Sequence, residues 1–380
     1  MTRVELKSAF IHGADAVPVV VEVSVEQKSL PSFNIVGLVD AAVIETRERV
    51  RCAIRSVGYD YPENGRILVN LAPSTIRKTG SSFDLPIALG ILAATGQIDH
   101  TLLENTLSFG ELNLSGRVVE NERGFSAFAD LARKENLALV CSPVQSGIPS
   151  DIDNIETKCL DNISDIRDGA ITTISLFCHT EREKADVENI EGYQWLIDGI
   201  EQAIREKRGI VVFTRPDKTI NQIIANIPMM MPDMTEEEMR VCSRIHSCVK
   251  EPFDGLRPFR APHHSAALVS LLGGGKPIYP GEVSLAHNGV LFLENLEEFS
   301  PSALSQIKVA QKERAAHIVR ADGQVAIPSN FMFVATASPC PCGHYGNPDH
   351  ECRCNTERVL TYQDRLKSWA NAFDCIILRA

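Results

Sequence analysis

The sequence lacks any apolar run of the roughly 18 residues that a membrane-spanning helix needs. Its first residues, MTRVELKSAFIHGADAV, also lack the uninterrupted apolar core of a secretory signal peptide. These two absences predict a soluble protein of the cytoplasm that has no part in the membrane. The length of 380 residues, with 44% hydrophobic and 23% charged residues, is enough for two domains with sizeable cores.

A net positive charge is lacking as well. The 49 acidic residues outnumber the 38 lysines and arginines, which gives a formal net charge of −11 at pH 7. Such a chain has no global attraction for nucleic-acid phosphates. Contact with DNA would therefore need a local basic patch or an assembled ring.

The eleven cysteines do not have the density of a disulfide framework, because they belong to a long chain and seven of them are scattered. The other four form two Cys-x-Cys pairs separated by nine residues: Cys340, Cys342, Cys352 and Cys354. Four thiolates around a Gly/Asn/Pro turn predict a tetrahedral structural Zn²⁺ site. The alternatives are a reduced cysteine-rich loop, or a site in which His344 or His350 replaces one cysteine.

Hydrophobic periodicity predicts an α/β domain over residues 1–175. The expected elements are strands and helices in alternation, at 17–25, 41–58, 66–73 and 83–96, then a hairpin at 107–119, a helix at 124–135 and a strand at 137–143. The polar stretch that follows predicts a linker at 176–191.

A second α/β domain is predicted over residues 192–380. Its expected elements are a helix at 193–207, a strand at 209–214, a helix with a capping box at Thr235 and Glu238, a strand at 289–295, a helix from Ser300 and a strand at 331–338.

Three long stretches of unusual composition lie at 34–98, 256–295 (LRPFRAPHHSAALVSLLGGGKPIYPGEVSLAHNGVLFLEN) and 331–354. They resemble the magnesium-chelatase-like AAA+ proteins of the ComM/YifB family over nearly the whole chain. The resemblance implies a Lon-protease-like (ribosomal S5 domain 2-like) N-terminal domain, followed by an AAA+ P-loop core. The helical lid of the family would follow Ala380, so we expect a core without it. Better-studied members form rings, hydrolyse ATP with Mg²⁺ and act on DNA.

The segment RGIVVFTRPDKT places Lys218 and Thr219 where a phosphate-binding loop has its Lys and Thr. That loop needs glycine six positions and one position before the Lys, so that backbone N–H groups can wrap the phosphates. Val212 and Asp217 occupy those positions, and a carboxylate there would repel phosphate. The segment predicts a residual nucleotide loop or an ordinary strand-to-helix turn, and the turn is the favoured interpretation.

The other catalytic positions are changed too. Aligned with the family, Glu294 and Asn295 take the places of the Asp that holds Mg²⁺ and the Glu that orients water, and an amide cannot act as that base. Ser338 takes the sensor position, and Ala372, or Phe373 without a gap, takes that of the trans-acting arginine. The sequence thus predicts a pseudo-ATPase rather than the alternative, an ATP-dependent DNA-remodelling motor with a divergent site.

A Lon-like serine hydrolase is a further alternative. The segment RKTGSSFD places Ser82 at the position of the nucleophile, and Ser126 falls where the lysine base should be. A serine hydroxyl without a base is a poor nucleophile at neutral pH. Lys78 is close in sequence but has no established role as the base, so peptidase activity is not expected.

The partners expected from the resemblance are copies of the chain or AAA+ relatives in an oligomer, together with DNA. By the same resemblance, Arg257, Arg260 and the pair His263–His264 lie near the ring pore, where they would touch DNA. A polar loop that packs on its own domain is an equally good interpretation. The function expected is scaffolding or regulation of DNA processing.

Overall fold

The computed structural model describes residues 2–27, 29–119, 123–143, 155–166, 172–173, 192–320, 323–347 and 350–379. The chain divides into two compact units. Unit 1 contains Met1–His179 together with Ser243–Asp254, and unit 2 contains Thr180–Cys242 together with Gly255–Ala380. The predicted linker at 176–191 lies outside the described residues.

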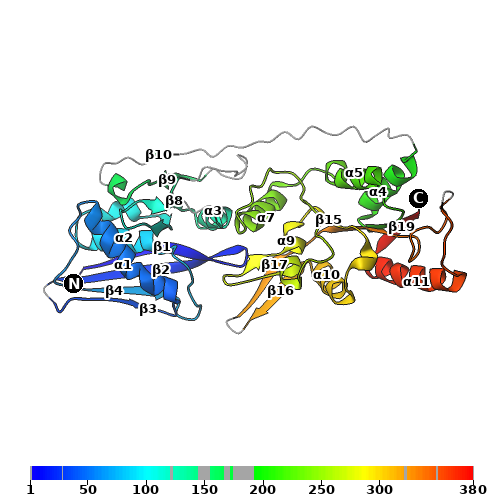
Figure 1. Cartoon of the computed structure of the whole chain (residues 1–380). Coiled ribbons are helices and arrows are strands. Elements are labelled where there is room, and N and C mark those ends of the chain that lie inside the picture. Colours follow the sequence, from blue (N-terminus) through cyan, green and yellow to red (C-terminus); the bar gives the residue numbers. More distant parts are fainter. Residues whose placement is uncertain are drawn as a thin grey trace. The chain divides into compact units, whose positions relative to one another are not determined.

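Unit 1 is built on one mixed sheet, which in the described part of the chain has eight strands in the order β10-β9-β8-β5-β1-β2-β4-β3 (Figure 1). The strands are β1 (Thr2–His12), β2 (Asp15–Gln27), β3 (Ser32–Val36), β4 (Gly65–Ala72), β5 (Thr106–Ser108), β8 (Ala138–Cys141), β9 (Thr157–Cys159) and β10 (Thr172–Thr173). The pairs β1–β2 and β2–β4 are antiparallel, and β1, β5, β8 and β9 run parallel. A separate hairpin joins β6 (Glu111–Leu112) to β7 (Val118–Val119).

Helices cover both faces of this sheet. Successive side chains of a strand point to opposite faces, so one strand contributes residues to the cores on both sides. Leu6 and Phe10 of β1 join the core under α1 (Ala41–Ser56) and α2 (Asp84–Ala94), whereas Ala9 joins the core under α3 (Phe125–Lys134). Asp40 begins α1 by accepting a hydrogen bond from the N–H of Val43 at 3.0 Å. The described part of the unit also contains two short 3₁₀ helices, η1 (His100–Leu103) and η3 (Ile163–Ile166).

The segment Ser243–Asp254 belongs to unit 1 although it follows residues of unit 2 in the chain. Ser243 Oγ lies 2.8 Å from Ser126 Oγ, and Arg244 Nη1 lies 3.0 Å from Asp130 Oδ2. The carbonyl of Ser247 accepts a hydrogen bond from the N–H of Gly124 at 2.8 Å. Helix α7 (Glu236–Ser247) therefore contributes its first residues to unit 2 and its last ones to unit 1.

Unit 2 is built on a parallel sheet, which in the described residues has five strands in the order β12-β15-β18-β11-β19. The strands are β11 (Gly209–Phe213), β12 (Phe259–Arg260), β15 (Val290–Leu293), β18 (Met332–Ala337) and β19 (Cys375–Arg379). Three of them, β11, β15 and β18, are buried almost throughout, as expected for a sheet covered on both faces. Small two-stranded sheets pair β13 (Gly273–Gly274) with β14 (Tyr279–Pro280), and β16 (Ala315–Arg320) with β17 (Gly323–Pro328).

Alternate residues of the strands in unit 2 pack on different helices. Val212 and Val334 face the core of α4 and α5, whereas Val211 and Phe333 face that of α10 and α11. The helices are α4 (Gln194–Glu206), α5 (Lys218–Ala225), α6 (Ile227–Met230), α8 (Leu268–Leu272), α9 (Glu282–Leu285), α10 (Pro301–Glu313) and α11 (Thr356–Ala372), with the short η4 (Leu296–Glu298). The result is a sheet between two layers of helices, an α/β architecture.

Most elements predicted from periodicity are present within a few residues of their expected bounds. The capping box is confirmed, since Thr235 N–H donates to Glu238 Oε2 at 2.9 Å and Glu238 N–H donates to Thr235 Oγ1 at 3.3 Å. The prediction of one hairpin over 107–119 is partly wrong, because β5 is a strand of the main sheet and only β6 and β7 form a hairpin. Among the described residues, none of the helices is long and apolar enough to cross a membrane.

Candidate functional site

The carboxyl ends of β11, β15 and β18 meet at one edge of the unit 2 sheet, because these strands run parallel and lie next to one another. In open α/β sheets, ligands bind beyond this edge, near the point where the strand order reverses. The predicted residues that follow these strands therefore come together here: Lys218, Thr219, Glu294, Asn295 and Ser338. Ala372 does not join them, because it precedes β19, whose amino end lies at the opposite edge.

The N-terminus of α5, where a phosphate would bind, is capped by the side chain of Asp217. Its Oδ1 accepts hydrogen bonds from the N–H groups of Thr219 at 2.8 Å and Ile220 at 3.4 Å, and its Oδ2 accepts one from the hydroxyl of Tyr193 at 2.7 Å. Burial raises the pKa of Asp217, but these hydrogen bonds outweigh burial and bring the pKa below its ordinary value. A carboxylate of the chain itself thus fills the place that an anion takes at a helix N-terminus.

Replacing Asp217 with alanine is expected to destabilise unit 2 by about 1 kcal/mol, the usual cost of losing an N-cap. Because the folded pKa is depressed, this stabilisation is present above about pH 4 and is lost as the pH falls through the folded pKa. Urea unfolding followed by the fluorescence of Trp195 and Trp369, both in unit 2, would measure it. Lys218→Ala, which changes the exposed neighbour, is the control; equal stability of the two variants at pH 7 would contradict the expectation.

The groups on the strand ends are also bound within unit 2. Glu294 Oε1 accepts a hydrogen bond from Asn221 Nδ2 of α5 at 2.8 Å. Asn295 has a left-handed backbone, with φ of 56°, and its N–H donates to Thr336 Oγ1 at 3.2 Å. The N–H of Ser338 donates to Glu297 Oε1 at 3.1 Å, so Glu297, which follows the Glu294 position closely in the sequence, also lies at this edge.

The four cysteines of the 340–354 segment lie together, and their sulfur atoms are all within 4.8 Å of one another. The Sγ of Cys340 is 3.4 Å from that of Cys342 and 3.7 Å from that of Cys352, and the latter two are 3.6 Å apart. A tetrahedron with Zn–S bonds of about 2.3 Å separates its sulfur atoms by about 3.8 Å. The cluster, which includes Cys354, could therefore hold a metal ion of this kind.

Backbone groups support the cysteine cluster. The N–H of Tyr345 donates to Cys340 Sγ at 3.3 Å, and the N–H groups of His344 and Arg353 lower the pKa of Cys342 to about 6. Burial and the neighbouring thiols raise the pKa of Cys352 and Cys354, so Cys342 carries the thiolate most readily. A lowered pKa favours the thiolate, which is the form that binds metals. Gln363 of α11 donates to the carbonyl of Pro339 at 2.9 Å and so ties the start of the segment to the helix.

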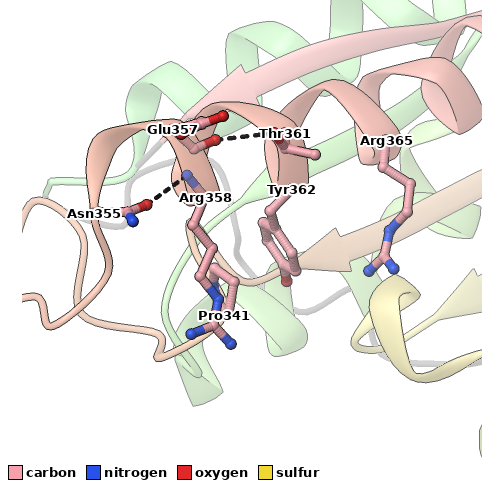
Figure 2. Close-up of a pocket in the computed structure, with 7 residues that line it drawn as sticks. All are labelled: Pro341, Asn355, Glu357, Arg358, Thr361, Tyr362 and Arg365. Atoms are coloured by element: carbon pink, nitrogen blue, oxygen red, sulfur yellow. Dashed lines mark hydrogen bonds between the residues drawn. The ribbon is translucent and has the colours of Figure 1, made fainter.

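A pocket of about 430 Å³ opens beside the cysteine cluster (Figure 2). One face of α11 forms most of it, with Pro341 of the cysteine segment on the other side. Figure 2 shows Arg358, Tyr362 and Arg365 pointing to the same side of α11, with the tyrosine ring between the two arginines. The ring packs partly on the core of unit 2, and burial first, then the charge of Glu297, raises the pKa of Tyr362.

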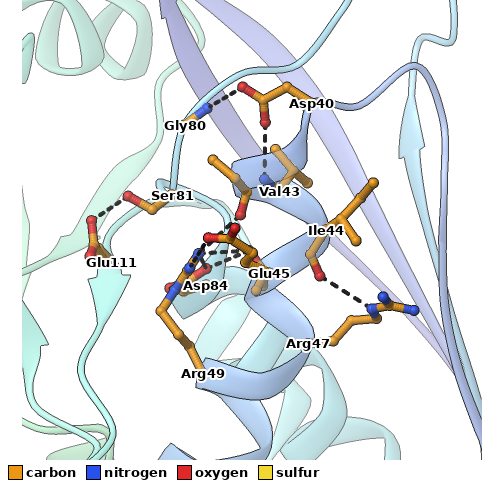
Figure 3. A network of polar contacts seen from close by, with 12 residues as sticks. Asp40, Val43, Ile44, Glu45, Arg47, Arg49, Gly80, Ser81, Asp84 and Glu111 are labelled. Atoms are coloured by element: carbon orange, nitrogen blue, oxygen red, sulfur yellow. Dashed lines mark hydrogen bonds and ion pairs between the residues drawn. The ribbon is translucent and has the colours of Figure 1, made fainter.

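Unit 1 contains a buried polar network centred on Asp84, the first residue of α2 (Figure 3). Its carboxylate accepts hydrogen bonds from Thr46 Oγ1 at 2.6 Å, from Arg49 Nε at 2.6 Å and Nη2 at 3.0 Å, and from the N–H of Leu112 at 3.2 Å. Burial raises the pKa of Asp84 above its ordinary value, and the four hydrogen bonds, which favour the ionised form, offset this rise only in part. The network joins α1, α2 and β6.

The residues considered for a hydrolase do not form a nucleophile–base pair among the described residues. Ser82 Oγ donates to the carbonyl of Ala9 at 3.4 Å, and Ser126 is bonded to a second hydroxyl, that of Ser243. Lys78 is fully buried and its ammonium group donates to the carbonyl of Pro73, while burial lowers its pKa.

The basic segment around His263–His264 is engaged within unit 2. Arg260 forms a bidentate pair with Glu282, at 2.7 and 3.0 Å, and Arg257 Nε donates to the carbonyl of Pro232 at 2.6 Å. His264 Nδ1 lies 2.8 Å from a carboxylate oxygen of Glu298. These contacts favour a segment that packs on its own unit over one that offers its charges to DNA.

The parallel sheet between two helix layers, with the site at the carboxyl ends of its strands, defines a P-loop-like α/β protein. Residues 186–375 match the family model "Magnesium chelatase, subunit ChlI", and residues 21–146 match "Subunit ChlI of Mg-chelatase". The chain is 32% identical over 369 residues to the uncharacterized protein YifB of Escherichia coli (strain K12), which covers 93% of this chain and 71% of the relative. It is also 32% identical over 381 residues to the competence protein ComM of Haemophilus influenzae, with 96% and 74% covered. The chain belongs to the magnesium-chelatase-like family that includes YifB and ComM.

Proposed function

We propose that this chain is a pseudo-ATPase that keeps the fold of the family, does not hydrolyse ATP, and acts as a scaffold or regulator in DNA processing. The observation that carries the proposal is the capping of α5 by Asp217. To bind the phosphates of ATP, the N–H groups of Thr219 and Ile220 would have to release this carboxylate, and the negative charge would stay beside the phosphates.

The remaining positions support the same proposal. Asn295 has no carboxylate to activate water, and its own N–H is bound to Thr336. Phe373, the other residue aligned with the family's arginine, is buried and its ring stacks on Phe333 with centroids 3.9 Å apart. Neither Phe373 nor Ala372 can supply the positive charge that an arginine finger brings to the transition state, a loss of about 10³ or more in rate.

The link to DNA processing comes from relatives rather than from the site. The name of ComM describes a competence protein, and the resemblance of the sequence to this family implies action on DNA. We infer that this chain assembles with copies of itself or with AAA+ relatives in such a process, in the cytoplasm, where its cysteines would stay reduced.

We further infer that unit 1 is a Lon-like domain without peptidase activity. Its support is the alternation of strands and helices and the position of Ser82 two residues before α2. Ser126, at the position where a Lon-type protease would have its lysine base, shares a hydrogen bond with Ser243. Among the described residues, neither Ser126 nor Lys78 is bonded to Ser82 as a base, and we propose that unit 1 serves recognition or assembly.

For the cysteine cluster we propose a closed structural Zn²⁺ site formed by Cys340, Cys342, Cys352 and Cys354. The support is the sulfur-to-sulfur distances, which suit four cysteines around one ion. The ion would fix the segment between β18 and α11.

The proposed loss of catalysis predicts no ATP turnover above background by the purified full chain with Mg²⁺ present. Lys218→Ala should change neither turnover nor ATP binding, because the lysine has no phosphate loop around it. The measurement is phosphate release together with titration of a fluorescent ATP analogue. The second candidate function is an ATP-dependent motor with a divergent site, because Glu294 and Lys218 lie at the same edge of the sheet. Micromolar ATP affinity, with Mg²⁺-dependent turnover that is lost in Lys218→Ala, would support this motor and contradict the pseudo-ATPase.

A further inference from the structure

We infer that the pocket on α11 binds a nucleotide unit of single-stranded nucleic acid, with Arg358 and Arg365 on the phosphates and Tyr362 beneath the base. The inference deepens the proposed link to DNA processing but is independent of whether the chain hydrolyses ATP. It assigns the nucleic-acid contact to α11 rather than to the segment that contains Arg257 and Arg260.

The charge of the two arginines is available to a ligand. Both are exposed, and within the described ranges their guanidinium groups make no ion pair. Arg260, in contrast, is held by Glu282, and Arg257 by backbone carbonyls and the nearby carboxylate of Glu238 at 3.7 Å. In a chain of net charge −11, two exposed guanidinium groups that form no ion pair in the described residues make the kind of local patch that phosphate binding requires.

The spacing places these charges around an aromatic ring. Arg358, Tyr362 and Arg365 are four and three residues apart, so they fall on one face of α11, as Figure 2 shows. The guanidinium carbon of Arg365 lies 5.5 Å from the centroid of the Tyr362 ring. An aromatic face flanked by arginines stacks on any base and holds the adjoining phosphates, which is how proteins bind single strands without reading sequence.

The pocket is fixed on both sides by its connections. Pro341 lies between two cysteines of the cluster, and Asn355 follows directly after Cys354 and caps α11 through the N–H of Arg358 at 2.8 Å. The ring of Tyr362 is held by the core of unit 2. A preformed pocket of this kind loses little conformational entropy on binding.

One residue that lines the pocket, Glu357, has a charge that repels an anionic ligand, so its substitution gives a test with the opposite expected sign. Glu357 adds a negative charge to the rim, so the pocket carries two positive charges and one negative. Removing this carboxylate should strengthen binding of an anion, whereas removing either arginine should weaken it.

The test measures binding of a fluorescein-labelled oligothymidylate to the full chain by anisotropy over a range of salt concentrations. Arg358→Gln and Arg365→Gln should each weaken binding about tenfold and reduce the slope of log K against log salt by about 0.7 per lost phosphate contact. Tyr362→Leu should weaken binding about tenfold or more, and Tyr362→Phe, which keeps the ring, should bind like the wild type. Glu357→Gln should bind several-fold more tightly.

Arg205→Gln, at an exposed arginine of α4, is the matched control and should leave affinity and slope unchanged. Circular dichroism confirms that each variant is folded. The inference is overturned if the double variant of Arg358 and Arg365 binds as well as the wild type. It is also overturned if ATP displaces the oligonucleotide at equal nucleotide concentration, since the pocket would then hold a free nucleotide. ATP turnover would overturn the pseudo-ATPase and leave this inference standing.

Discussion

Cys354→Ser is expected to release about one zinc ion per chain and to lower the stability of unit 2 by several kcal/mol. A serine hydroxyl is a poor zinc ligand, and the three remaining thiolates would keep their charges crowded within a few ångströms of one another. Metal binding contributes directly to the free energy of folding when the ligands come from one short segment. The loss should therefore loosen the connection between β18 and α11.

The measurement is zinc content by mass spectrometry of protein purified without chelators, with thermal unfolding in parallel. Cys52→Ser is the matched control, because Cys52 is an exposed thiol of α1 far from the cluster in sequence and should leave zinc content unchanged. Wild-type protein that contains no zinc would dispose of the zinc proposal. Loss of the metal should also weaken oligonucleotide binding at the α11 pocket, because Pro341 and Asn355, which line this pocket, are neighbours of the cysteines in the sequence.

Asp84→Asn is expected to destabilise unit 1 by about 3–5 kcal/mol, the usual result of breaking a buried ion pair by removing one partner. The amide keeps the shape of the carboxylate but turns one acceptor into a donor that faces the donors of Arg49 and Thr46. Arg49, which is only 20% exposed, would then keep its charge without its buried partner. Helices α1 and α2 and strand β6 would lose the hydrogen bonds that join them at Asp84.

Glu45→Gln provides the control for this prediction. Glu45 also pairs with Arg49, at 3.8 Å, but it is 72% exposed, so its loss should cost less than about 0.5 kcal/mol. Urea unfolding by circular dichroism gives both free energies, and hydrogen exchange at the N–H of Leu112 reports the network directly. Similar losses of unfolding free energy in Asp84→Asn and Glu45→Gln would show that the Asp84 network does not stabilise unit 1 more than an exposed ion pair does.

Periodicity predicted the helices and strands whose side chains alternate between core and solvent. The predicted elements omit β1, an 11-residue strand inside the unit 1 sheet, and the pair β16 and β17. They also omit β3 and β19, which are short strands at the edges of their sheets. Helix α11 was missed although its signals are present, with Asn355 as N-cap and Val359, Leu366 and Ala370 buried at helical spacing.

The candidate site was only partly predictable. Lys218, Glu294, Asn295 and Ser338 could be proposed from their positions after strands, but their meeting at one edge depends on a strand order that no local pattern contains. Asp217 was interpreted as a turn former that repels phosphate. Its bond to Tyr193, 24 residues earlier, is a tertiary contact, and it shows that the carboxylate occupies the helix N-terminus.

The inclusion of Ser243–Asp254 in unit 1 means that neither unit is a continuous stretch of polypeptide. A fragment that starts at residue 192 would carry this segment without the surface that buries Ile245 and Phe253, and a fragment that ends at 175 would leave that surface bare. Each fragment would therefore expose apolar area and tend to aggregate when produced alone. Produced together, the two fragments should reassociate through this segment, so a nicked chain would keep its native structure.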